Sequence, residues 1–207
     1  MHTIYILSLL CVLALLARSA PLQKCSGKTG LPMENSEFQK TVKNCSSLVY
    51  KVQCDIPEVK KSWALSLDSS APNLEYIVST LGIPPSPTLM ALSADFDMEL
   101  CLNRMYEGLQ LYQDLLSAIR DRISNPEKVT DLLIDIRDLL THVLKMQELA
   151  QLKQGVQYGG SGLSSRLTEE YEVQVAADVV LSQLLSFSQD VYRSLRNIGL
   201  AKSAARC

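Results

Sequence analysis

Cysteine is the residue type in this chain that is best suited to covalent chemistry. The chain has six cysteines, and one of them, Cys11, lies in an apolar leader at the N-terminus. The other five are Cys25, Cys45, Cys54, Cys101 and Cys207. In an oxidising compartment such thiols pair as disulfides, and an odd number leaves at least one of them unpaired.

Histidine, which often serves as a general base or a zinc ligand, is rare. Of the two histidines, His2 lies in the leader and His142 lies in a stretch with helical periodicity. One imidazole cannot form a zinc cluster, and the sequence contains no nucleophile elbow, phosphate-binding loop or metal-ligand spacing. We therefore expect a protein that is not an enzyme and that uses no metal or other cofactor.

The leader has the features of a secretory signal. Residues 4–17 are almost wholly apolar, which matches a signal-peptide core and falls short of the ~20 residues of a membrane helix. Small residues favour cleavage after Ser19 or after the residue that follows it. We expect residues 1–19 to be a signal peptide and residues 20–207 to be a secreted domain.

The charge pattern narrows the class of partner. The formal net charge is −2, and the longest basic run is Lys60-Lys61. No apolar run after the leader approaches the length of a membrane span. We therefore expect neither nucleic-acid binding nor membrane insertion.

Four stretches place an apolar residue at every third or fourth position. The first series is Phe38, Val42, Cys45, Val49, Val52 and Ile56, and the last is Val173, Ala177, Val180, Leu184, Phe187, Val191, Ser194 and Ile198. This spacing gives each helix one apolar stripe, as in a helical bundle. The sequence predicts helices at about 35–55, 94–124, 127–153 and 169–199.

Capping residues mark the expected helix ends. Ser93 is suited to cap the second helix, and Asn125 to cap the third, with Pro126 at its first position. Gly155 is suited to stop the third helix. Thr168, followed by two glutamates, marks the start of the fourth.

The connections between the helices indicate the topology. The second and third helices are joined by a short link, so they must be antiparallel. The first and third connections, of about 37 and 15 residues, are long enough to run the height of the bundle. We predict an all-α, long-chain four-helix bundle, in which up-up-down-down topology is possible, with a short extra helix within 74–84.

The second helix contains a recognisable motif. From Cys101 the pattern is a cysteine, six residues, Gly-Leu, two residues, an aromatic residue, three residues and a leucine. It resembles the signature of the interleukin-6 and granulocyte colony-stimulating factor family of cytokines. The matching residues are Cys101, Gly108, Leu109, Tyr112 and Leu116.

Two further matches favour the colony-stimulating factor branch over an interleukin-6-type cytokine. Residues 81–84 read Leu-Gly-Ile-Pro, and residues 192–196 read Tyr-Arg-Ser-Leu-Arg; both resemble that branch. The resemblance implies a monomeric ligand that clusters a type I cytokine receptor and drives granulocyte-lineage proliferation and differentiation. A lipid-carrying bundle is the alternative class, although it would need broader apolar faces.

The resemblance also implies two receptor contacts. One is a face of the first and third helices, where Asp135 and Asp138 match the acids of the family and lie off the core stripe. The first helix there has Lys40, Lys43, Asn44 and Lys51 in place of the family's glutamate. The other contact is the bundle end near Tyr171, with Glu75 or Glu58 as an acidic companion; alternatively, Tyr171 only covers that end.

The family's disulfides are altered. A cysteine ten positions before Cys101 is replaced by Ala91. The other implied bridge has Cys45 and Cys54 as candidates. In a helix their Cα atoms would be ~13 Å apart rather than ~5.5 Å, so the helix must end before Cys54 or Cys45 is a buried thiol.

Two covalent modifications are also predicted: a disulfide at Cys101 and N-glycosylation at Asn44. In up-up-down-down topology, Cys25, Cys101 and Cys207 share one end of the bundle, so we expect Cys101 to pair with one of the other two or to stay reduced. Asn44-Cys45-Ser46 matches the N-glycosylation pattern, although it lies on a predicted helix.

Overall fold

The computed structural model describes residues 35–62, 74–90, 96–123, 126–155 and 158–204. These residues form helices and contain no strand. The expected signal peptide, Cys25 and Cys207 lie outside them. The elements are α2 (Ser36–Ser62), α3 (Leu74–Leu81), α4 (Met98–Arg120), α5 (Glu127–Leu149), the short 3-10 helix η2 (Leu163–Ser165) and α6 (Glu170–Ala204).

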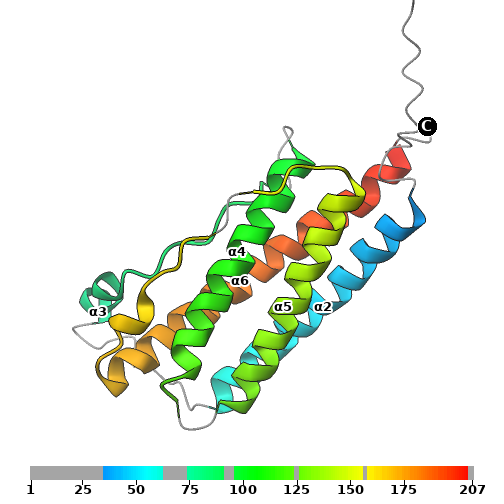
Figure 1. Ribbon diagram of the computed structural model, residues 1–207. Helices are drawn as coiled ribbons and strands as arrows, with labels where there is room; N and C mark the ends of the chain where they lie inside the picture. The colour runs from blue at the N-terminus through cyan, green and yellow to red at the C-terminus, as the bar shows by residue number, and fades with distance from the viewer. Residues whose placement is uncertain (1–34, 63–73, 91–95, 124–125, 156–157, 205–207) are drawn as a thin grey trace, which may run out of the picture.

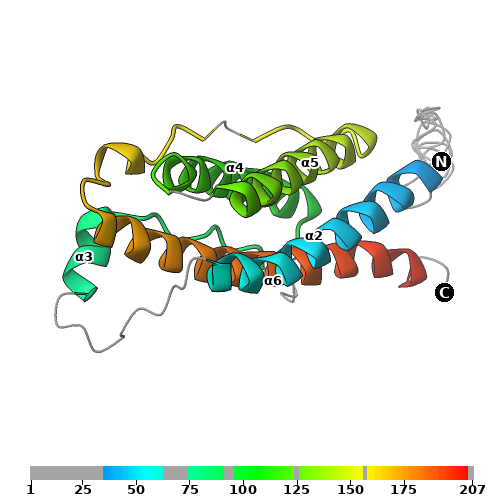
Figure 2. The ribbon, with the colours of Figure 1, turned by 90° about the horizontal axis from the view of Figure 1, so that it is seen from below.

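The four long helices form an up-up-down-down bundle. In Figure 1, α2 and α4 run in one direction, and α5 and α6 run in the other. Helix α2 packs against α5 and α6, and α4 packs against the same two helices. The extra helix α3 packs against α6 at one end of the bundle, as Figures 1 and 2 show. The predicted all-α bundle is therefore confirmed.

The apolar stripes form the core. Every residue of the predicted first and last stripes is buried, with exposed fractions between 0% and 5%. Burial of each valine, leucine, isoleucine or phenylalanine among them contributes roughly 1.5–3 kcal/mol before the cost of conformational entropy. The periodicity that defined the helices thus also defined which side of each helix faces its neighbours.

The family motif in α4 is explained by packing. Gly108 lies directly under the ring of Phe187 from α6, and a Cβ atom at Gly108 would be only 2.3 Å from Phe187 Cζ. The same ring packs on Tyr112, with centroids 5.4 Å apart. The Tyr112 hydroxyl hydrogen-bonds Ser86 in the first long connection. The motif residues therefore hold α6 and the first long connection against α4.

Helix α2 continues past its expected end at residue 55. It runs through Pro57 to Ser62, although an internal proline removes a backbone hydrogen bond and crowds the preceding turn. Ile56 and Val59, on either side of the proline, are 0% and 1% exposed. We attribute the continuation to this burial, because an earlier end would remove Val59 from the core.

Two helices start differently from their expected caps. Helix α4 begins at Met98, and the Asp97 carboxylate accepts hydrogen bonds from the backbone N–H groups of the first turn; the expected cap, Ser93, lies outside the described residues. Pro126 occupies the N-cap position of α5 rather than its first helical position. Asn125 also lies outside the described residues.

Helix α5 ends at Leu149, before the expected stop at Gly155. The chain turns at Gln151, which adopts a left-handed φ of 55°. The N–H of Leu152 then donates to the carbonyl of Gln147 at 2.9 Å. This is the hydrogen bond of a Schellman motif, formed here without the usual glycine.

Helix α6 begins at Glu170 and extends beyond residue 199 to Ala204. Thr168 lies just before the cap position, where its N–H and hydroxyl donate to the Glu172 carboxylate. The N–H of Glu169 donates to the same carboxylate at 3.0 Å. These bonds, led by the one from the Thr168 hydroxyl, lower the pKa of Glu172. The side chain that closes this helix start is thus Glu172.

Candidate functional site

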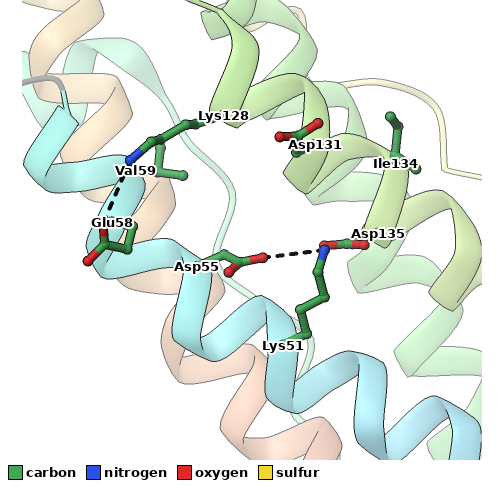
Figure 3. A pocket seen from close by; sticks show the side chains of 8 residues that line it. All are labelled: Lys51, Asp55, Glu58, Val59, Lys128, Asp131, Ile134 and Asp135. Carbon is green, nitrogen blue, oxygen red and sulfur yellow. Dashed lines mark hydrogen bonds and ion pairs between the residues drawn. The ribbon is translucent and has the colours of Figure 1, made fainter.

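A groove between α2 and α5 is the first candidate binding surface (Figure 3). Its position is set by the antiparallel packing of the two helices. The lining side chains are mostly charged: Lys51, Asp55, Glu58 and Val59 from α2, and Lys128, Asp131, Ile134 and Asp135 from α5. We refer to this surface as the α2–α5 groove.

Three ion pairs join α2 to α5 across and beside this groove. Glu37 lies 2.6 Å from Lys145, and Glu58 lies 3.7 Å from Lys128. Between them, Lys51 pairs with Asp135. Residue numbers rise along α2 while they fall along α5, as antiparallel neighbours require. The two outer pairs are exposed and contribute little to stability.

The central pair changes the expectation for Asp135. This acid was expected to be free for a receptor, but it is only 7% exposed and accepts a hydrogen bond from Lys51 Nζ. Lys51 Nζ also lies 3.5 Å from Asp55. The bond to Asp135 raises the pKa of Lys51. Asp135 is off the central stripe, but the neighbouring helix covers it.

On its α5 side, the α2–α5 groove exposes apolar and acidic side chains beside the paired lysines. Ile134 is 47% exposed, and Asp131 and Asp138 on the same helix are exposed. Neither acid forms an ion pair with any residue that the structure describes. The sequence analysis identified Asp138 but missed Ile134. The position of Ile134 outside the apolar stripe of its helix could have indicated that its side chain is exposed.

The lysines predicted beside these acids lie elsewhere. Lys40 and Lys43 line a different groove, between α2 and α6. Lys51 is the residue of this group that faces α5. Asn44 is exposed on α2, whereas Cys45 of its glycosylation pattern is fully buried. The structure therefore separates the candidates that sequence analysis had placed in one contact.

The second candidate surface is the end of the bundle where α3 packs against α6. Tyr171, in the first turn of α6, is 40% exposed. Glu75 is exposed on α3, and its neighbour Tyr76 is 73% exposed. Glu58, the other proposed companion, lines the α2–α5 groove instead. Tyr76 was missed because the sequence does not show which face of the short helix is covered.

No disulfide joins any two of the cysteines that the structure describes, Cys45, Cys54 and Cys101. Because α2 is continuous through both residues, Cys45 and Cys54 do not form the bridge that the family implied. Cys45 is 0% exposed, and burial raises its pKa to about 12. Cys54 is exposed. Cys101 is buried, which raises its pKa; pairing with Cys25 or Cys207 remains a prediction.

The described ranges contain neither a metal-binding cluster nor a membrane-spanning helix. No group of three or more His, Cys, Asp or Glu side chains there is arranged to hold a metal ion. None of the helices in this part of the chain has the length and apolar character required to cross a membrane.

Comparison with curated proteins gives consistent relatives. Granulocyte colony-stimulating factor of Bos taurus is 30% identical over 192 residues, covering 90% of this chain and 96% of the bovine protein. The Felis catus factor is 27% identical over 190 residues, covering 91% and 97%. The Sus scrofa factor is 28% identical over 155 residues, covering 73% and 78%. No family model matches the chain.

The helical bundle and these relatives together define a helical cytokine rather than an enzyme. Within that class, the chain belongs to the granulocyte colony-stimulating factor family. The resemblance found in the α4 motif thus agrees with similarity over most of the sequence.

Proposed function

We propose that the protein is a secreted growth factor that binds and clusters a type I cytokine receptor of the granulocyte colony-stimulating factor receptor type. Clustering would drive proliferation and differentiation of granulocyte-lineage cells. The names of the relatives support the cell lineage, since each is a granulocyte colony-stimulating factor. Residues 1–19 would be removed as a signal peptide before the ligand acts.

The α2–α5 groove is the observation that carries the proposal. Ile134 and Asp131 line it, and Asp138 lies one turn beyond Ile134 on the same helix. Both acids are exposed and have no ion pair among the residues that the structure describes. An apolar side chain surrounded by charged groups is suited to the centre of a protein interface, where the surrounding contacts exclude water. The acids would meet basic groups on the receptor, which favours rapid association and the correct register.

The bundle end supplies a second surface. Tyr171 and Tyr76 expose aromatic rings on α6 and α3, with Glu75 beside them. Tyrosine is common among residues that dominate binding energy. This end and the α2–α5 groove are separate surfaces, so one ligand could engage two receptor chains at once.

Titration against the cognate receptor ectodomain tests this proposal. Asp138→Lys should raise Kd about tenfold or more, or roughly 1.4 kcal/mol, because it places a cation where we expect a basic receptor group. Tyr171→Ala should weaken the second contact and reduce the number of receptor chains per complex, measured by light scattering. Lys153→Glu, an exposed change in the α5–α6 connection, is the matched control.

Normal binding by both Asp138→Lys and Tyr171→Ala would remove both surfaces from the proposal. A wild-type protein that does not bind the ectodomain would remove the receptor assignment itself. N-terminal sequencing of the secreted protein tests the signal peptide, which predicts a mature chain that starts at residue 20 or 21.

A further inference from the structure

A second groove lies on the other side of α2, against the last turns of α6. The start of α2 and the end of α6 lie side by side at one end of the bundle (Figures 1 and 2). Val42 and Leu195 are buried between the two helices. We refer to this surface as the α2–α6 groove. It shares no lining residue with the α2–α5 groove.

Exposed apolar side chains gather at the α2–α6 groove. Tyr192 is 39% exposed and Leu200 is 56% exposed, and both line it. Large apolar groups that lie together on a surface often mark a place where another molecule binds. A partner that covered them would remove apolar area from water, which is favourable.

Gly199 lines this groove. Glycine inside a helix costs about 1 kcal/mol relative to alanine, so its presence calls for a reason. At Gly199 a Cβ atom would have Val42 Cγ1 as its nearest contact, at 3.9 Å, which is an ordinary contact. Packing therefore does not require glycine here, and no positive φ requires it either.

The charge on the α2–α6 groove has one sign. Lys40, Lys43 and Arg196 line it, and no carboxylate does. None of these three cations forms an ion pair with a carboxylate among the described residues. The nearby acid Glu37 is paired with Lys145. This basic surface lies on a chain whose net charge is −2, so it is a local feature.

We propose that the α2–α6 groove binds an acidic segment of a partner protein, and that an apolar side chain of that segment packs on Tyr192 or on Leu200, which lie on either side of Arg196 along α6. Charge complementarity with the three cations selects an acidic partner. The exposed apolar side chains favour a protein segment over a sulfated polysaccharide, which would use the cations alone. The inference goes beyond receptor binding by the other two surfaces and does not depend on it.

The test uses the full mature chain labelled with ¹⁵N and a synthetic peptide that contains one phenylalanine among glutamates. Saturable amide shifts should appear at Lys43, Tyr192 and Leu200. Changing phenylalanine to alanine in the peptide should weaken binding, and a lysine-for-glutamate peptide should not bind. The double variant Lys43→Glu/Arg196→Glu should lose about tenfold or more in affinity, whereas Lys153→Glu should bind normally.

The outcomes separate the possibilities. No saturable shift at the groove, or equal shifts with the lysine peptide, would overturn the inference. Binding of a heparin oligosaccharide at the groove without binding of the acidic peptide would also overturn it, because the apolar side chains would then have no role. Because the peptide experiment contains no receptor, a negative result would not count against the proposed receptor function, which the receptor titration tests separately.

Discussion

The helices in the described part of the chain contain two glycines, Gly108 and Gly199, and they lie in opposite surroundings. At Gly108 the missing side chain is replaced by the ring of Phe187, which fills the space between α4 and α6. At Gly199 the space between α6 and α2 holds only an ordinary contact with Val42 and opens to solvent as the α2–α6 groove. Packing thus requires a glycine at position 108 in the interior, but it does not require one at position 199 at the surface.

The same contrast holds for the lysines of α2. Lys51 is tied to Asp135 of α5 and helps to hold two helices together. Lys43 is exposed and lines an open groove. The comparison teaches that residues which resemble each other in the sequence can be structural in one place and available to partners in another. Changes at both kinds of position can test it.

Gly108→Ala should have the largest effect on stability. The added Cβ would lie 2.3 Å from Phe187 Cζ, and the buried ring cannot move without disturbing Tyr112. We expect a loss of about 2–3 kcal/mol in the free energy of unfolding, because overpacking exceeds the gain in helix propensity. Urea denaturation measures it. Adding Phe187→Leu should restore part of the loss, and unchanged stability would disprove the packing explanation.

Lys51→Met should have the next largest effect. It leaves the Asp135 carboxylate covered by the neighbouring helix but without its ammonium partner. We expect a loss of about 1–2 kcal/mol, less than for a fully buried pair because the Lys51 side chain is itself half exposed. Lys43→Met is the matched control, with an expected change within about 0.5 kcal/mol. Equal losses in the two variants would contradict the contrast between these lysines.

Tyr112→Phe should give a smaller loss. The ring would still pack on Phe187, but the hydrogen bond to Ser86 in the first connection would be lost. One such bond contributes about 1 kcal/mol net. Urea denaturation measures this loss, and limited proteolysis should cut the first connection faster next to the buried Leu89, while protection of α4 is unchanged. Loss of protection throughout α4 would show that the hydroxyl has a wider role.

Gly199→Ala should have the smallest effect and the opposite sign. Because Val42 provides only an ordinary contact at 3.9 Å, the gain in helix propensity should stabilise the protein by about 0.5–1 kcal/mol. The same methyl group should narrow the α2–α6 groove and weaken binding of the acidic peptide. A destabilised variant would show that glycine is needed there for packing.

The periodic parts of the fold were predictable from sequence, because a helix buries one side and that side repeats every three or four residues. The end of α2 was not predictable, since Pro57 suggests a break and only the burial of Val59 shows why the helix continues. Gln151 likewise ends α5 in a conformation for which glycine is the usual signal.

The candidate site was predictable only in part. Asp138 was identified from its position and is exposed. The covering of Asp135 could not be predicted, because it is buried beside Lys51 of α2, which is distant in sequence; its role in receptor binding stays a prediction. Ile134 and Tyr76 were missed for a related reason: which side of a helix remains exposed depends on which neighbour packs against it.

We propose that this cytokine binds a receptor through two surfaces, the α2–α5 groove and the end of the bundle where α3 packs against α6. Hydrogen exchange of the mature chain, with and without the cognate receptor ectodomain, tests this claim most directly. We expect added protection around residues 131–138 of α5, with a second protected region at the start of α6 near Tyr171. Protection that appears only in α4 or in the rest of α6, with residues 131–138 unchanged, would contradict this proposal.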